Sequence, residues 1–199
     1  MQADNWTRRD LYGGAITCEI PSDWRDVSDI RQVPDHQECW QQQGPEGAVL
    51  VVEILEREQS VSDENAATYF FRDLAEANGA VLPQDGSFSN FPVSGDDNEE
   101  LKKTKRLPAD SRIVSGVGCQ KVAMGRDTDI AGNPRQQEIR WIQVNLAAIR
   151  LPSQGTDLLV TLSVPLGSVR GPDDFPKKFD ERFIRLLSSM NIQDWSLFG

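Results

Sequence analysis

Several features on which membrane proteins and secreted proteins depend are missing from this 199-residue sequence. A membrane-spanning helix needs about 20 apolar residues, and the longest aliphatic run, 48–52, already ends at Glu53. The first ten residues are charged and lack an apolar stretch, so we expect neither a secretory signal nor an acid-poor transit peptide. The three cysteines, Cys18, Cys39 and Cys119, are widely spaced. An odd count without a secretion signal predicts reduced thiols in the cytosol or nucleus.

Residues that carry common enzyme chemistry are also scarce. His36 is the only histidine, which excludes multi-histidine zinc sites and makes any Ser–His or Cys–His pair depend on this one residue. We expect an exposed loop histidine. The sequence has no phosphate-binding G-x-x-x-x-G-K-[ST] loop and no G-x-S-x-G elbow. Gly116 and Gly118 lie inside a strand pattern and indicate a bulge or close packing. We therefore expect no cofactor, no bound metal and no covalent catalysis.

Positive charge is rare in the first half of the chain. The formal net charge is −10, and residues 1–100 hold 6 Lys and Arg against 21 Asp and Glu, whereas residues 101–199 hold 15 against 10. Simple wrapping around nucleic acid is disfavoured, because binding to phosphates needs a basic surface. The acidic first half indicates a basic partner, although acidity alone often serves only solubility.

Hydrophobic periodicity predicts several strands. Residues 16–20 alternate between apolar and polar, as a half-buried strand does. Residues 48–56 have apolar side chains on both sides, which indicates a strand buried on both faces. Short connections, typical of antiparallel neighbours, separate three further expected strands at 112–124, 137–151 and 157–164.

Two helices complete an α+β pattern, in which an antiparallel sheet is packed by helices. One is expected at 62–77, where an apolar face recurs at helical spacing, and the other at 172–190. We expect residues 1–10 to be a loose tail and residues 11–199 to be a single domain. A charged surface loop is expected at 94–110.

The densest group of polar residues lies between residues 23 and 38. Three interpretations remain open from composition: a solvated acidic loop, a hard-cation site whose spacing differs from that of an EF-hand, and a protein-binding patch. The last is suggested by apolar residues between the charges, such as Trp24 and Ile30. The polar residues are Asp23, Asp26, Ser28, Asp29, Arg31, Asp35, His36, Gln37 and Glu38.

A short basic run lies within the charged loop. It consists of Lys102, Lys103, Lys105 and Arg106, interrupted by Thr104. Such a run is either a nuclear import signal, read as an extended chain, or an ordinary solvated loop.

Two sequence blocks resemble the Ran guanine-nucleotide release factor family. The first is Leu-Tyr-Gly-Gly-Ala-Ile at 11–16, and the second runs from Asp26-Val-Ser-Asp-Ile-Arg to Val-Pro-Asp-His-Gln-Glu at 33–38. Weaker similarity continues through 49–56, 66–73, 149–152, 156–159 and the terminal Trp-Ser-Leu-Phe at 195–198.

The resemblance implies a fold and a function. The fold is an α/β sandwich with a mainly antiparallel sheet of about six strands, similar to the lumenal extrinsic photosystem proteins. The activity is binding of the GTPase Ran and release of its guanine nucleotide, with the GTP form preferred, in nuclear import. We expect a monomer in nucleus and cytoplasm, without nucleic acid or membrane insertion, and a ternary complex with a Ran-binding protein. The alternative is a scaffold that uses the same acidic surface, without nucleotide exchange, to bind another transport partner or a membrane partner.

Family likeness also implies a Ran-binding surface. It includes the acidic residues of the second block, with neighbouring residues of the same segment. Carried over to this sequence, they are Asp26, Asp29, Pro34, Asp35, Gln37 and Glu38.

Overall fold

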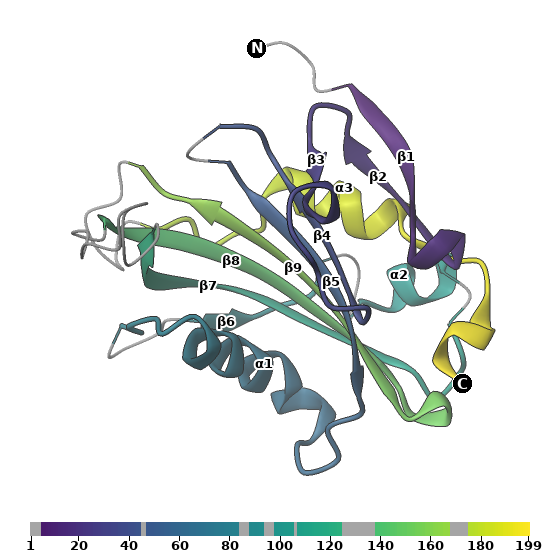
Figure 1. Ribbon diagram of the computed structural model, residues 1–199. Coiled ribbons are helices and arrows are strands. Elements are labelled where there is room, and N and C mark those ends of the chain that lie inside the picture. The colour runs from purple at the N-terminus through teal and green to yellow at the C-terminus, as the bar shows by residue number, and fades with distance from the viewer. Residues whose placement is uncertain are drawn as a thin grey trace.

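The computed structural model describes residues 5–44, 47–83, 88–93, 98–105, 107–124, 138–167 and 175–199. These residues form three layers around a seven-stranded sheet (Figure 1). Helix α1 (Asp63–Ala77) lies on one face, while a three-stranded sheet and helices α2 (Glu99–Thr104) and α3 (Glu181–Ser189) lie on the other. Every strand pair in both sheets is antiparallel, which confirms the α+β class.

Strand order follows the chain only in part. The small sheet has the order β1-β2-β10, and the large one has the order β3-β4-β5-β9-β8-β7-β6. The strands are β1 (Trp6–Leu11), β2 (Ile16–Pro21), β3 (Arg25–Asp26), β4 (Gln37–Gln41), β5 (Val49–Glu56), β6 (Phe88–Asn90), β7 (Arg112–Met124), β8 (Glu138–Leu151), β9 (Thr156–Pro165) and β10 (Asn191–Ile192). The predicted strands and the helix at 62–77 are thus confirmed within one or two residues at their ends. None of the described helices is long and apolar enough to cross a membrane.

The larger core fills the space between the two sheets. Leu50 and Val52 of β5 meet Ile16 and Ile20 of β2 in this core, together with Phe183 of α3, and all five side chains are fully buried. Because the core draws residues from the first strand to the last turn, it joins the two ends of the chain.

A prediction that fails concerns the second face of β5. Leu50 and Val52 are buried as expected, but Val49 and Val51, which point to the opposite face, are only half-buried. By contrast, β8 is buried on both faces from residue 142 to residue 151. The difference arises because α1 packs on β6, β7 and β8, towards the other edge of the sheet.

The predicted loose tail is a strand from Trp6 onward. β1 pairs with β2 along its whole length, from Trp6 opposite Pro21 to Leu11 opposite Ile16. Its charged composition conceals this, because Arg9 stacks on the ring of Trp40 at 5.2 Å instead of remaining in water. Residues 1–4 of the predicted tail lie outside the described residues.

The second predicted helix is shorter than its apolar pattern suggests. α3 begins after Asp180, whose side chain accepts a hydrogen bond from the backbone N–H of Arg182 at 2.8 Å. Phe175 and Phe179 are buried as predicted, but they precede the helix. Apolar spacing alone missed this N-cap, and residues 172–174 lie outside the described part.

Of the two interpretations of Gly116 and Gly118, a bulge or close packing, the structure confirms close packing at Gly116. Gly116 of β7 lies opposite Asn90 of β6. A Cβ atom at this position would lie 2.5 Å from the carbonyl oxygen of Ser89, so only glycine lets β6 approach.

The charged loop at 94–110 contains α2, and one of its lysines is buried. Lys105 is only 6% exposed and donates hydrogen bonds to the carbonyl oxygens of Ser188 and Met190, at 3.3 and 2.5 Å. These carbonyls end α3, where a cation is favoured by the helix dipole. The prediction of a fully solvated loop is therefore wrong at Lys105.

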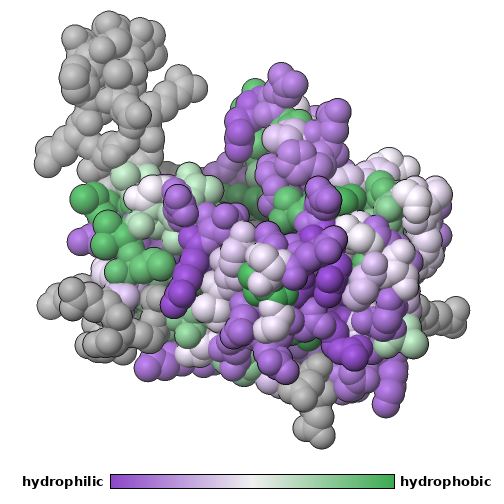
Figure 2. All heavy atoms as spheres, turned by 90° about the horizontal axis from the view of Figure 1, so that it is seen from below, coloured by the Kyte–Doolittle hydropathy of each residue, from purple (hydrophilic) through white to green (hydrophobic). Residues whose placement is uncertain are grey.

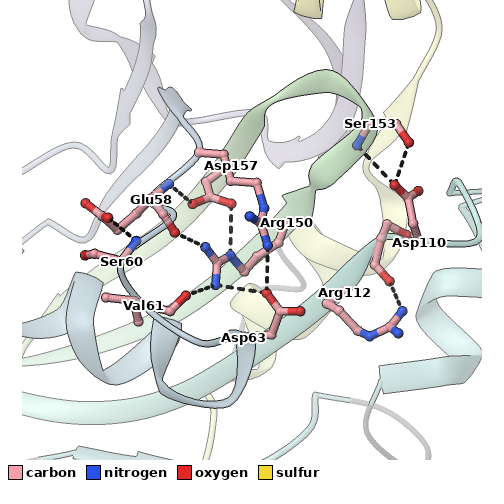
Figure 3. Close-up of polar contacts among 11 residues, drawn as sticks. Glu58, Ser60, Val61, Asp63, Asp110, Arg112, Arg150, Ser153 and Asp157 are labelled. Carbon is pink, nitrogen blue, oxygen red and sulfur yellow. Dashed lines mark hydrogen bonds and ion pairs between the residues drawn. The ribbon is translucent and has the colours of Figure 1, made fainter.

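A buried ion pair fixes the connection between β5 and α1 (Figure 3). Arg150 of β8 is fully buried and donates to the equally buried Asp157 of β9 at 3.1 Å. It also pairs with Asp63 at 2.9 Å, and it donates to the carbonyl oxygens of Glu58 and Val61. One guanidinium thus holds the loop before α1 against the hairpin of β8 and β9.

Loss of Arg150 should destabilise the fold strongly. Arg150→Met leaves Asp157 as a buried carboxylate without its ion-pair partner, which costs about 3–5 kcal/mol. Urea unfolding should therefore show a clearly lower midpoint than in the wild type. The control is Glu19→Gln, which removes an exposed pair with Arg185 and should cost less than about 1 kcal/mol. Equal losses in the two variants would contradict this role of Arg150.

Lys105 should make stability depend on pH. Burial lowers the pKa of its ammonium from 10.5 to about 8, so above pH 8 the folded chain has released a proton that the unfolded chain still holds. The unfolding free energy of the wild type should therefore rise with pH. Between pH 7 and pH 10 the rise should exceed that of Lys105→Met by about 2 kcal/mol. The measurement is the unfolding free energy of both proteins at each pH. If the difference in unfolding free energy between the two proteins is the same at every pH, the lowered pKa of Lys105 is refuted.

Candidate functional site

The second sequence block lies in a segment at the edge of the large sheet. We call this segment, residues 25–41, the arm. β3 pairs with the end of β4, with Asp26 opposite Trp40. The side chain of Asp26 accepts a hydrogen bond from Ser28 N at 2.8 Å and so caps the short 3-10 turn at 27–29. Val27 is buried beneath this turn, whereas Asp29 and Ile30 are exposed, Ile30 by 59%.

A tight turn precedes β4 and carries Asp35 near its tip. The backbone N–H of Gln37 donates to the carbonyl oxygen of Pro34 at 2.9 Å, which closes a β-turn over Asp35 and His36. Pro34, Asp35 and His36 are all exposed. The turn therefore presents the Asp35 carboxylate to solvent, and the prediction of an exposed histidine is confirmed.

Tyr12 of the first sequence block clamps this turn. Its hydroxyl donates to the carbonyl oxygens of Val52 and His36, at 2.7 and 3.0 Å. Its backbone N–H donates to Oε1 of Glu38 at 2.5 Å. Tyr12 has a φ of +50°, and Gly13 and Gly14 that follow also have positive φ. The two blocks are therefore in direct contact, although 26 residues separate Tyr12 from Glu38.

The electrostatics of the arm reflect this packing. Burial raises the pKa of Glu38, and the charge of Asp26 raises it further, whereas the hydrogen bond from Tyr12 N lowers it. Burial also raises the pKa of the Tyr12 phenol, with the charges of Glu38 and Glu53 adding to the effect. Asp26 lies opposite Trp40, two residues beyond Glu38 along the same side of β4, and the two carboxylates repel each other.

The six predicted binding residues do not share one face. Side chains alternate along β4, so Glu38 points to the Tyr12 side and Gln37 points to the opposite side. There Gln37 donates to Oε1 of Glu53 at 2.6 Å, and His36 Nε2 lies 3.4 Å from the same oxygen. The structure therefore brings Asp26 and Glu38 together and leaves Gln37 on the other side of the strand.

The basic run at 102–106 is divided in a similar way. Lys103 is exposed, Lys102 is half-buried and donates to the carbonyl oxygen of Ala109, and Lys105 is held by the end of α3. Arg106 lies outside the described residues. Because import receptors read extended chains, Lys105 would have to leave α3 before this run could act as an import signal.

A groove that the sequence interpretation missed lies on the α1 side of the sheet. It has a volume of about 530 Å³ and lies between α1 and the side of β5, β8 and β9 that faces this helix. Figure 2 shows the molecule from this side, where hydrophobic residues reach the surface in patches among hydrophilic ones. The half-buried Val49 and Val51 line it, and their apolar character was the signal that could have pointed to it.

The described part of the chain contains no cluster of side chains that could form a metal site. No group of three or more His, Cys, Asp or Glu among the described residues is placed to hold a metal ion. Cys18, Cys39 and Cys119 are buried free thiols, and burial raises the pKa of each. What the arm offers chemically is an acidic surface held in place by hydrogen bonds.

Comparisons with known proteins agree with the resemblance found in the sequence. The Ran guanine nucleotide release factor of Bos taurus is 29% identical over 194 residues, which cover 95% of this chain and 95% of that protein. The nuclear import protein mog1 of Schizosaccharomyces pombe is 28% identical over 159 residues, which cover 78% of this chain and 75% of that protein.

A solved structure shares the fold. The crystal structure of the Saccharomyces cerevisiae Ran-binding protein Mog1p has a TM-score of 0.65 to this chain, covering 99% of this chain and 100% of that one, at 21% sequence identity. At this identity the likeness concerns the fold.

A family model described as the Ran-interacting Mog1 protein matches residues 9–165. The match includes both sequence blocks, the Tyr12 turn and the whole arm. Because it spans most of the sequence, the chain belongs to the family of Ran-interacting Mog1 proteins.

Proposed function

We propose that this chain binds the small GTPase Ran and promotes release of its guanine nucleotide, with the GTP form preferred, and that it thereby acts in nuclear protein import. The observation that carries the proposal is the family match over residues 9–165. Relatives of similar length are named as Ran release factors and nuclear import proteins. The chain acts without a covalent step, as a monomer in nucleus and cytoplasm, and a Ran-binding protein joins it in a ternary complex.

The arm is the proposed contact surface. The Asp35 turn, the exposed Asp29 and the pair Asp26 and Glu38 present acidic groups on one segment, with the apolar Ile30 among them. Charged groups around an apolar residue are typical of a recognition surface. Pro34 fixes the start of the turn, and Gln37 supports it from behind through Glu53.

Thermodynamic linkage explains how such a surface releases a nucleotide. A GTPase holds its nucleotide with Mg²⁺, a P-loop lysine and ordered switch segments. A partner that binds the nucleotide-free conformation more tightly must weaken nucleotide binding by the same factor. Carboxylates on the arm supply that preference when they pair with basic groups of Ran that the nucleotide otherwise engages.

The direct test measures nucleotide release from Ran by stopped flow. Ran is loaded separately with fluorescent GDP and GTP analogues and mixed with increasing amounts of this protein. Release should accelerate with dose, and more strongly for the GTP form. Binding without acceleration would make the chain a scaffold, and the absence of both would overturn the proposal.

Removal of the exposed carboxylate at the turn should weaken Ran binding without harming the fold. Asp35→Ala deletes a solvent-exposed side chain, so its unfolding free energy should stay within about 0.5 kcal/mol of wild type. Its affinity for nucleotide-free Ran should fall about tenfold or more, as expected for a lost charge-assisted contact. Glu100→Ala, which removes an exposed carboxylate on α2, is the control and should bind normally. An Asp35→Ala affinity within about twofold of wild type would remove Asp35 from the contact surface.

Glu38 should show separate structural and binding roles. Glu38→Ala loses the acceptor for Tyr12 N, which costs about 1.5–3 kcal/mol for a bond to a charged group, and it also loses the charge. Glu38→Gln keeps an oxygen for Tyr12 N, so its melting temperature should approach that of wild type, while its ability to release nucleotide from Ran should remain impaired. Full release activity in Glu38→Gln would mean that Glu38 acts only by holding Tyr12.

A further inference from the structure

The large sheet has apolar side chains on a face that α1 leaves open. Val49 and Val51 of β5 point to this face and are half-buried, whereas the same face of β8 is buried from residue 142 to residue 148. We propose that the groove beside α1 is a second interaction site, which binds an amphipathic basic segment of a partner polypeptide. The site is separate from the Ran surface proposed above and does not depend on it.

The floor and walls of the groove are apolar. Val49, Val51 and Leu55 come from β5, Phe70 and Leu74 come from α1, and Leu159 and Ile142 extend the floor across β9 and β8. Its volume of about 530 Å³ lies within the range of specific binding sites. An apolar hollow of this size in contact with water favours a ligand that fills it with aliphatic side chains.

The polar residues of the groove define the charge of its ligand. Glu53 lies on the β5 side and the exposed Asp73 lies on the α1 side, with the amides of Gln37 and Asn78 beside them. Among the described residues that line the groove, none is Lys, Arg or His. An apolar floor flanked by carboxylates on both sides is complementary to a segment whose lysines or arginines border its aliphatic side chains.

Charge also argues against self-association at this site. The chain carries a formal net charge of −10, and most of the excess acid lies in residues 1–100, which supply both carboxylates of the groove. A second copy would bring like charge to the groove, which disfavours docking. The occupant is therefore a different, basic polypeptide.

β4 separates the groove from the Ran surface. Gln37 faces the groove, while Glu38, the next residue, faces Tyr12 on the opposite side. Gln37 thus belongs to the arm and also lines the groove, but Val51 and Asp73 line the groove from outside the arm, so the groove can be altered without a substitution in the arm.

The test uses the full chain and three synthetic helical peptides labelled with a fluorophore. The first has leucines along one face and lysines along the other, the second replaces the lysines with glutamates, and the third replaces the leucines with serines. Fluorescence anisotropy should show saturable binding of the leucine–lysine peptide. The leucine–glutamate and serine–lysine peptides should each bind at least about tenfold more weakly.

Two variants place the binding in the groove. Asp73→Lys reverses one of the two charges and should weaken the leucine–lysine peptide about tenfold while improving the leucine–glutamate peptide. Val51→Trp places a large ring over the floor of the groove and should abolish binding of both the leucine–lysine and the leucine–glutamate peptide. Glu76→Lys makes the same charge reversal on the same helix outside the groove lining and should leave binding unchanged. Thermal unfolding of each variant verifies that it is folded.

Each outcome decides the proposal. Absence of saturable binding overturns it, as does equal binding of the lysine and glutamate peptides. Binding that Asp73→Lys does not change, or that Glu76→Lys weakens equally, also overturns it. Nucleotide release from Ran, measured on Asp73→Lys in parallel, should equal that of wild type, so a failure of the groove proposal is distinguishable from a failure of the Ran proposal.

Discussion

A single helix has to cover one whole face of a seven-stranded sheet, and much of this molecule follows from that mismatch. Neighbouring strands lie about 4.8 Å apart and a helix with its side chains is about 10–12 Å wide, so one helix spans only two or three strands. α1 covers the β6, β7 and β8 side, where β8 is buried on both faces. The β5 side remains open, and its valines line a groove. Arg150 holds the first turn of α1 to the hairpin of β8 and β9 through its ion pair with Asp63.

The strands and α1 could be predicted because their apolar residues repeat at the period of the element they form. Predictions failed where a tertiary contact replaced solvent. The charged composition of residues 6–10 predicts a tail, but Arg9 lies on Trp40 and these residues pair with β2. The charged run predicts a solvated Lys105, but its ammonium donates hydrogen bonds to the last carbonyl oxygens of α3. The start of α3 depends on the cap by Asp180, which apolar spacing does not reveal. The apolar residues on both sides of β5 predict burial of both faces, but the second face stays partly open because α1 lies over β6, β7 and β8.

In the candidate site, too, some features could be predicted from the sequence and others depend on tertiary contacts. Resemblance located the acidic arm, and the turn that exposes Asp35 agrees with a role in recognition. Neither composition nor spacing indicated that Glu38 also binds Tyr12 N, or that Gln37 faces away from Glu38. Those facts depend on strand register and on the left-handed backbone at Tyr12. The first sequence block therefore has a physical reason for its sequence: Tyr12 closes the turn of the second block, and the glycines after it allow the chain to reverse.

We propose that the arm at residues 25–41, clamped by Tyr12, is the surface that contacts Ran. The most direct measurement is hydrogen–deuterium exchange of this chain alone and in complex with nucleotide-free Ran. If the arm contacts Ran, peptides that cover residues 25–41 and 11–14 should gain protection in the complex, with little change along α1. Protection that appears elsewhere while residues 25–41 exchange as in the free chain would contradict it.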